Sequence, residues 1–311
     1  MSLQEITGTE VPARPTLREW LNAPSAASPG QARAQSIWRG CKRLGRNPAA
    51  MLGLVILLAL VFAAIFAPSL TIYGPYDQDL ARRLSPPSAD HWFGTDDLGR
   101  DIYSRILHGA RITLRIAALA ALIAGPIGLL VGTTAGYLGG WVDIVAMRVV
   151  DVFLSFPALI LALAFVAALG AGINNAVIAI ALAAWPPIAR LARAETLSVR
   201  KSDYIAAARL TGAGPLRIIV MHVMPMCVPS VIIRITLNMA GIILTAAGLG
   251  FLGLGAQPPM PEWGAMLASG RQFMLTNWWL ATMPGLAILL VSLSFNLLGD
   301  GLRDVLDPRH G

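Results

Sequence analysis

Charged side chains are scarce in this 311-residue sequence, where Asp, Glu, Lys and Arg make up 13% of the residues and apolar types make up 56%. An ordinary soluble domain is about a quarter charged. A helix needs about 20 apolar residues to cross a bilayer. Four charge-free stretches fit one crossing each, and a fifth, of 38 residues, fits two; they are 47–76, 116–142, 235–261, 272–299 and 152–189. The composition predicts an all-α polytopic membrane protein with six transmembrane helices.

The residue types that build enzyme and metal sites are also few. The two cysteines, Cys41 and Cys227, are far apart, which argues against a disulfide framework or a cysteine metal site. The four histidines show no HExxH-type pairing, and no GxxxxGK[ST] phosphate loop is present. We therefore expect a chain that is not an enzyme, holds no metal or cofactor itself, and takes any energy for uphill transport from another subunit.

Ionisable groups are almost missing from the interiors of the expected spans. An ion-coupled carrier usually places such groups there to bind or relay the coupling ion. Arg234, about two turns into the fifth span, either snorkels to the cytoplasmic interface or lines a pathway. Asp143 and Asp151 are expected to cap helices or form pairs at the cytoplasmic boundary. A secondary carrier remains an alternative without a convincing site.

The basic residues fix the expected orientation of the spans. The expected spans are 49–70, 116–137, 149–169, 176–188, 228–249 and 279–298. Excess Lys and Arg mark cytoplasmic segments. Residues 1–46 hold seven Lys and Arg against three acids, and 190–217 hold six against two, whereas the loop 72–111 is nearly balanced. Membrane topology therefore explains the net charge of +7 better than nucleic-acid binding does.

This orientation divides the chain into segments. We expect a cytoplasmic N-terminal tail (1–46), a transmembrane domain (47–299) and a cytoplasmic C-terminal tail (300–311). Within the domain, 72–111 is an outer loop and 190–226 is a cytoplasmic loop. Gly125, Gly128, Gly132 and Gly136 in the second span predict close helix packing rather than a dedicated dimer motif.

The cytoplasmic loop has an unusual pattern. Tyr204–Thr211 is rich in alanine and predicts a helix. Gly212 suits the left-handed conformation that ends a helix, and Leu216–Pro225 then starts a second helix towards the membrane. On the residues alone, this loop either docks on a soluble partner or only connects two spans.

The loop resembles the EAA motif of permease subunits of ATP-binding-cassette (ABC) importers. Ala207, Ala208 and Gly212 match the motif, Pro225 falls at the expected distance, and Ala206 occupies the position of the glutamate. The resemblance marks Tyr204 and Arg209 as further members of an ATPase-coupling loop. The missing glutamate removes any salt bridge which that residue would make with the ATPase.

Other segments resemble the dipeptide/oligopeptide/nickel branch of this family, in particular the dipeptide permease C type. They are Arg46–Ala49, Phe93–Asp101 with Ser104–Arg105 and Gly109–Arg111, Phe251–Pro259 and Asn296–Asp304, and the likeness covers about residues 38–309. Taken only as structure, Gly94–Asp96 and Gly99–Asp101 build turns and pair charges within the outer loop. Gln257–Pro261 either braces the outer vestibule or contacts a binding protein.

The resemblance implies a type I ABC importer permease fold in the bacterial inner membrane. This chain would form half of a pathway with a second homologous permease. Two ATPase subunits would bind ATP and magnesium, and an external solute-binding protein would deliver the solute. Short peptides are the expected solute, and nickel or a glutathione-type solute of the same branch is the alternative. A membrane-embedded enzyme, the remaining class, lacks a catalytic cluster.

Overall fold

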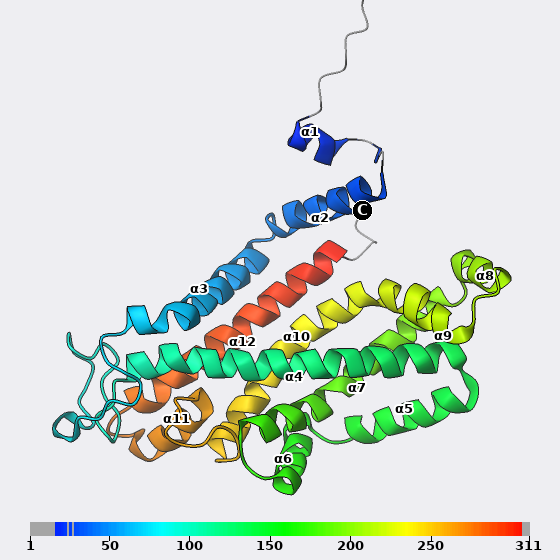
Figure 1. The fold of residues 1–311 in the computed structure, drawn as a ribbon. Coiled ribbons are helices and arrows are strands. Elements are labelled where there is room, and N and C mark those ends of the chain that lie inside the picture. Colours follow the sequence, from blue (N-terminus) through cyan, green and yellow to red (C-terminus); the bar gives the residue numbers. More distant parts are fainter. Residues whose placement is uncertain (1–15, 24, 27, 307–311) are drawn as a thin grey trace, which may run out of the picture.

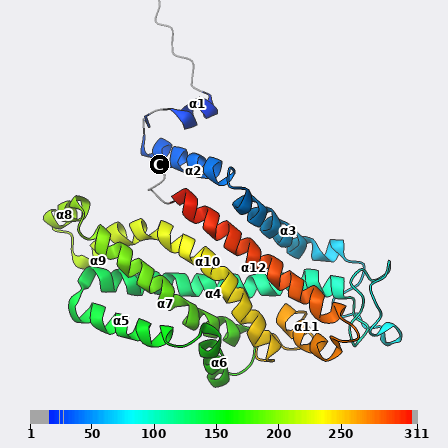
Figure 2. The same ribbon diagram turned by 180° about the vertical axis from the view of Figure 1, so that it is seen from behind.

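The computed structural model describes residues 16–23, 25–26 and 28–306, and within them the chain is helical without a β-strand. Long helices run side by side, with the loop 71–101 at one end of the bundle and α8 at the other (Figures 1 and 2). The helices are α1 (Leu17–Asn22), α2 (Pro29–Leu44), α3 (Pro48–Leu70), η1 (Leu80–Arg82), α4 (Ile102–Leu138), α5 (Gly140–Leu154), α6 (Ala158–Leu169), α7 (Ile173–Val199), α8 (Asp203–Leu210), α9 (Pro215–Ile218), η2 (Ile219–Val223), α10 (Met224–Phe251), α11 (Trp263–Gly270), η3 (Arg271–Phe273) and α12 (Trp279–Leu306).

Five helical segments are long and apolar enough to cross a membrane: Pro48–Leu70, Ile102–Leu138, Ile173–Val199, Pro215–Phe251 and Trp279–Val305. They contain five of the six expected spans. The remaining expected span, 149–169, falls on two helices, because α5 and α6 meet there at 95°. Pro157 explains the break, since proline lacks an N–H and disfavours helical backbone in the residue before it. The bent pair makes the sixth span if it is counted as one.

Several helices extend beyond their expected limits. Span four was expected to end at 188, near Pro186 and Pro187, but α7 continues through both prolines to Val199. α4 has 37 residues, roughly 55 Å of helix, and begins 14 residues before the expected span. Neighbouring helices in a membrane bundle compensate for the backbone groups that proline frees. α12 likewise runs to Leu306, so residues 300–306 prolong the last span, and 307–311 lie outside the described residues.

The glycines of α4 bring it into close contact with α7, and this pair packs more extensively than any other. A Cβ atom added to Gly132 would lie 2.3 Å from the carbonyl oxygen of Ala189, and one on Gly128 would lie 2.7 Å from the Cβ atom of Ile188. Side chains larger than hydrogen therefore do not fit between these helices. The predicted close packing is confirmed within the chain.

The first and last motif segments meet at the end of the bundle that carries α2. The Asn47 side-chain oxygen accepts hydrogen bonds from the backbone N–H groups of Ala49 and Ala50 and so caps α3. Its Nδ2 atom donates to Asp304 at 3.2 Å. Gly301 packs directly on Ala50, where a Cβ atom would lie 2.2 Å from the alanine Cβ. Asp304 therefore contributes to packing between α3 and α12.

Candidate functional site

The helix α8 has the form that the sequence predicts. Its alanines continue the helix until Gly212, whose φ of +80° ends it in the left-handed region that favours glycine. The Gly212 N–H donates to the carbonyl of Arg209, and the Ala213 N–H donates to that of Ala208. These hydrogen bonds satisfy the last carbonyl groups of α8. The chain then reverses into α9, η2 and α10 (Figure 1).

A small apolar cluster anchors α8 to the bundle, and the sequence analysis did not identify it. Ile205 is fully buried against Ile218, Val223 and Cys227. Tyr137, at the end of α4, packs against the same cluster. Because Ile205 and Ala208 lie three residues apart, they share the buried face of α8. That spacing was the available signal in the sequence.

The opposite face of α8 is open to solvent. Ala206, Ala207 and Arg209 are exposed, while the predicted site residue Ala208 is buried. Leu210 and Leu216, which the sequence analysis did not single out as partner contacts, are 89% and 76% exposed. These two leucines and the three exposed predicted residues form what we call the α8 face. It combines apolar contact area with one positive charge.

Polar contacts connect α8 to its neighbours. The Tyr204 hydroxyl lies 2.7 Å from Nδ1 of His222, on the π-helical turn that precedes α10. Arg209 donates to the Tyr137 hydroxyl at 3.3 Å and lies over the ring of that tyrosine. Arg200 donates to the carbonyl groups of Gly136 and Tyr137. The end of α4 is thus held to the last turn of α8 and to the end of α7.

Two predicted site residues lie apart from this group. Pro225 is exposed in the first turn of α10. Arg234 is farther along the same helix, about 14 Å beyond Pro225 by helical rise. Its Nε atom is buried and has no hydrogen-bond partner among residues 28–306 or the other described positions. The structure therefore does not bring Arg234 to the α8 face.

Two ion pairs join α5 to α7. Arg190 donates to Asp151 at 2.5 Å, and Arg193 forms a two-bond pair with Asp143. The interpretation of these aspartates as pairing residues is confirmed. These pairs hold α5, the first helix of the bent segment, against the second half of α7.

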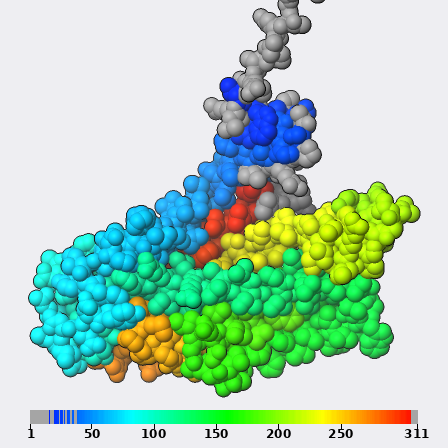
Figure 3. Space-filling view, viewed as in Figure 1, coloured from blue at the N-terminus to red at the C-terminus, as the bar shows by residue number. Residues whose placement is uncertain are grey.

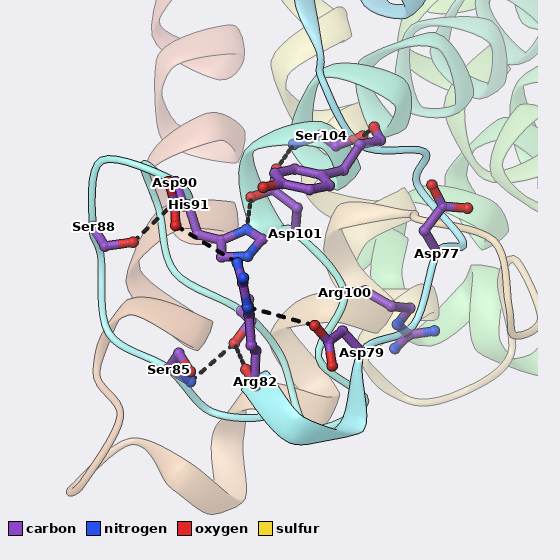
Figure 4. A network of polar contacts seen from close by, with 12 residues as sticks. Asp77, Asp79, Arg82, Ser85, Ser88, Asp90, His91, Arg100, Asp101 and Ser104 are labelled. Atoms are coloured by element: carbon purple, nitrogen blue, oxygen red, sulfur yellow. Dashed lines mark hydrogen bonds and ion pairs between the residues drawn. The ribbon is translucent and has the colours of Figure 1, made fainter.

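At the other end of the bundle, buried charges organise the loop 71–101 (Figure 4). Asp96 accepts a hydrogen bond from Arg100 Nε at 2.7 Å and lies 3.6 Å from Arg105 Nε. His91 Nδ1 lies 2.9 Å from Asp101, which also caps α4 by accepting from the Ser104 N–H. The predicted turns and charge pairs of this loop are confirmed.

Hollows also occur elsewhere in the bundle, among them a small cavity and a larger pocket. A cavity of about 260 Å³ between α6, α7 and α10 is mostly apolar and includes Asn238 and Thr245. A larger pocket of about 440 Å³ lies between α4, the start of α7 and the loop after α10, and its lining includes Arg115, Asn174 and Gln257. In the described part of the chain, no group of three His, Cys, Asp or Glu residues is placed to hold a metal ion.

The sequence matches two known families. Residues 126–310 match the family described as "Binding-protein-dependent transport system inner membrane component". Residues 33–87 match the "N-terminal TM domain of oligopeptide transport permease C". The two matches cover α2, α3 and the bundle from the last part of α4 onward, and residues 88–125 lie between them.

Curated relatives are similar over nearly the whole chain. The dipeptide transport system permease protein DppC of Alkalihalophilus pseudofirmus is 45% identical over 96% of this chain and 97% of its own length. The probable D,D-dipeptide transport system permease protein DdpC of Escherichia coli is 44% identical over 89% and 92%. The glutathione transport system permease protein GsiD of Escherichia coli is 44% identical over 93% and 95%.

A solved structure shows the same fold. The MetNI methionine ABC transporter in an inward-facing conformation aligns with a TM-score of 0.53 and 21% identity, over 65% of this chain and 96% of the other. The expected type I ABC importer permease fold is thereby confirmed. The chain is a membrane transport component rather than a catalytic subunit, and it belongs to the binding-protein-dependent transport system inner membrane components, the permeases of ABC importers.

Proposed function

We propose that this chain forms half of the membrane pathway of an ATP-driven importer of short peptides, and that the α8 face binds an ATPase subunit. The observation that carries the coupling role is the two-sided α8. One side is fixed to the bundle through Ile205, and the other exposes Leu210 and Leu216 to a partner. Exposed apolar groups that are not lipid-facing are typical of protein contacts.

The orientation follows from the charge of the segments. The excess of Lys and Arg in the N-terminal tail and around α8 supports a cytoplasmic position for both termini and α8. The loop 71–101 and α11 then face outward, where a solute-binding protein would dock. A second homologous permease would complete the pathway, and two ATPase subunits would hold ATP and magnesium. Closure of the ATPase pair would pull on α8 and rock the bundle between two states.

The peptide substrate is supported by the relatives. The names of the three relatives specify dipeptides, D,D-dipeptides and glutathione, and glutathione is itself a short peptide. This common chemistry favours short peptides over nickel. In this proposal the binding protein makes the first selection, and the permease pathway accepts solutes that share a peptide backbone.

The test is purification of the tagged chain, expressed with its chromosomal neighbours, in mild detergent. We expect a second six-span permease and ATPase subunits to co-purify. Replacing Leu210 and Leu216 by Ala is expected to lower ATPase recovery about tenfold or more, since burial of a leucine contributes about 1.5–3 kcal/mol. Leu275→Ala, an exposed leucine outside the α8 face, is the matched control. A chain that purifies alone and still transports would instead support a secondary carrier.

A further inference from the structure

Three segments far apart in the sequence enclose the pocket of about 440 Å³. α4 contributes Arg115, the turn into α7 contributes Asn174 and Asn175, and the loop after α10 contributes Gln257 and Met260. The Gly172 N–H donates to the carbonyl of Leu254 at 3.3 Å and ties two of these segments together. The volume falls within the range of about 300–1,000 Å³ that is typical of small-molecule sites. The pocket is therefore large enough for a small solute.

Arg115 is a cation without a counter-charge in the part of the chain that the structure describes. No carboxylate or carbonyl oxygen of residues 16–23, 25–26 and 28–306 forms a hydrogen bond or ion pair with it. Arg105, one of its neighbours on α4, is near Asp96, and Arg111 donates to the carbonyl groups of Ala64 and Ile65. Arg115 is also the last charge before the charge-free run 116–142. Its guanidinium is free to bind a ligand carboxylate through two parallel hydrogen bonds.

Two of the three amide side chains of the pocket, Asn175 and Gln257, are oriented by hydrogen bonds to backbone carbonyl groups. Asn175 Nδ2 donates to the carbonyl groups of Leu169 and Gly170 at 2.8 and 3.0 Å. Gln257 Nε2 donates to those of Gly253 and Gly255 at 3.0 and 3.1 Å. Because their NH₂ groups are used in this way, Asn175 and Gln257 offer a ligand their amide oxygens, which accept hydrogen bonds, while Asn174 offers both an oxygen and an NH₂ group.

The lining therefore offers a cation together with hydrogen-bond acceptors. This set is complementary to a zwitterion, whose carboxylate pairs with Arg115 while its N–H groups donate to amide oxygens. The flexible thioether of Met260 adapts to different apolar side chains. A divalent metal would be repelled by Arg115, and a neutral lipid chain would leave the guanidinium unpaired.

The position of the pocket agrees with this chemistry. α7 begins at the pocket and ends next to α8, so the pocket lies towards the other end of the bundle (Figure 1). Under the proposed orientation this is the outer side, where a binding protein releases its solute. In the space-filling view, the α8 segment lies at the opposite end of the molecule from the loop 71–101 (Figure 3).

We propose that this pocket is an entry subsite for the C-terminal carboxylate of a short peptide and that Arg115 recognises that carboxylate. The inference rests on the proposed function, because it assumes that the solute is a peptide. It adds a specificity-determining residue on the permease itself, in addition to any selection by the binding protein.

The test measures equilibrium binding of a radiolabelled dipeptide to the complete importer in nanodiscs, without the binding protein. For the wild-type complex we expect saturable binding, with the C-terminally amidated dipeptide competing at least about tenfold more weakly than the free acid. Arg115→Gln is expected to weaken free-acid binding by roughly 10- to 100-fold and to remove the discrimination. Arg115→Lys retains the charge but not the two-bond geometry, and it should be intermediate.

Arg83→Gln is the matched control, because Arg83 is an exposed arginine of the outer loop that does not line the pocket. Wild-type affinity in Arg115→Gln, equal loss of both peptides, or no saturable wild-type binding at millimolar peptide would overturn the subsite. Uptake into proteoliposomes with the binding protein separates the two proposals. If the wild-type complex imports no peptide, the proposed function fails. If it imports peptide and Arg115→Gln binds normally, only the subsite fails.

Discussion

The two ends of the bundle are held together by different interactions. The loop 71–101 is organised by buried charges, with Asp96 between two arginines and His91 beside Asp101. α8 is held by an apolar cluster around Ile205 and by a few half-exposed hydrogen bonds. Buried ion pairs demand one geometry, because a displaced charge loses its compensation. Apolar contacts tolerate small shifts. We therefore call the end with the loop 71–101 the fixed end and the end with α8 the adjustable end.

The largest expected effect comes from breaking the fixed end. Asp96→Asn leaves the buried Arg100 and Arg105 without their shared carboxylate, and we expect a loss of about 3–5 kcal/mol. Thermal unfolding of the purified complex measures it. Asp90→Asn is the control, because the Arg82–Asp90 pair is exposed and such pairs contribute about 0–1 kcal/mol. Equal effects of the two variants would contradict the contrast between buried and exposed pairs.

Breaking the adjustable end is expected to have a local effect. Ile205→Ala removes the buried anchor of α8, and substitutions of this kind cost about 2–5 kcal/mol. Since Ile205 belongs to the small cluster beneath α8 and not to the main core, we expect faster proteolysis within 200–215 and poor ATPase recovery while the spans stay folded. Leu210→Ala should lower recovery without changing proteolysis. Loss of the whole fold in Ile205→Ala would show that the cluster is not a local anchor.

A matched pair of glycines tests the turn that follows α8. Gly212 and Gly214 both have open space where a Cβ atom would be, but only Gly212 has a positive φ. Gly212→Ala should therefore cost about 1–2 kcal/mol and slow uptake, whereas Gly214→Ala should be nearly neutral. A β-branched residue at Gly212 is expected to abolish uptake at normal expression. Normal transport by that variant would rule out the coupling role of this loop.

The smallest change concerns the pH dependence of stability at the end of the bundle that carries α11 (Figure 1). Burial raises the pKa of the Glu262 carboxyl, and hydrogen bonds from the N–H groups of Gly264 and Ala265 oppose this rise. An unfolded glutamate titrates near pH ~4.3. The contribution of Glu262 to stability is therefore fully present below that pH and is lost as pH rises through the higher folded pKa. Glu262→Gln should remove this part of the pH dependence in thermal unfolding.

The sequence predicted features that depend on neighbours along the chain. Gly212 ends α8, and the glycines of α4 pack closely on another helix, because each effect follows from local geometry. The break at Pro157 also had a local signal. The continuous apolar run 152–189 hid this signal, since hydropathy shows that a segment can lie in lipid but not whether its helix is straight.

The features that were missed depend on contacts between distant segments. Ile205 becomes an anchor only when Ile218 and Cys227 return to it. Arg115 gains its pocket from Asn174 and Gln257, about 60 and 140 residues away along the chain. Spacing along one helix indicates the buried face of α8 but not which distant residues pack against it, so neither set of partners followed from the sequence.

The glycine contact between α4 and α7 has a mechanical consequence. The two helices pack as one unit, because α4 places no side chain between them at Gly128 or Gly132. One end of this pair includes Arg115 and Asn174, and the other includes Tyr137 and the start of the turn into α8, some 33 Å away by helical rise. A helix pair that moves as one rigid body would carry a displacement applied at α8 to the mouth of the pocket.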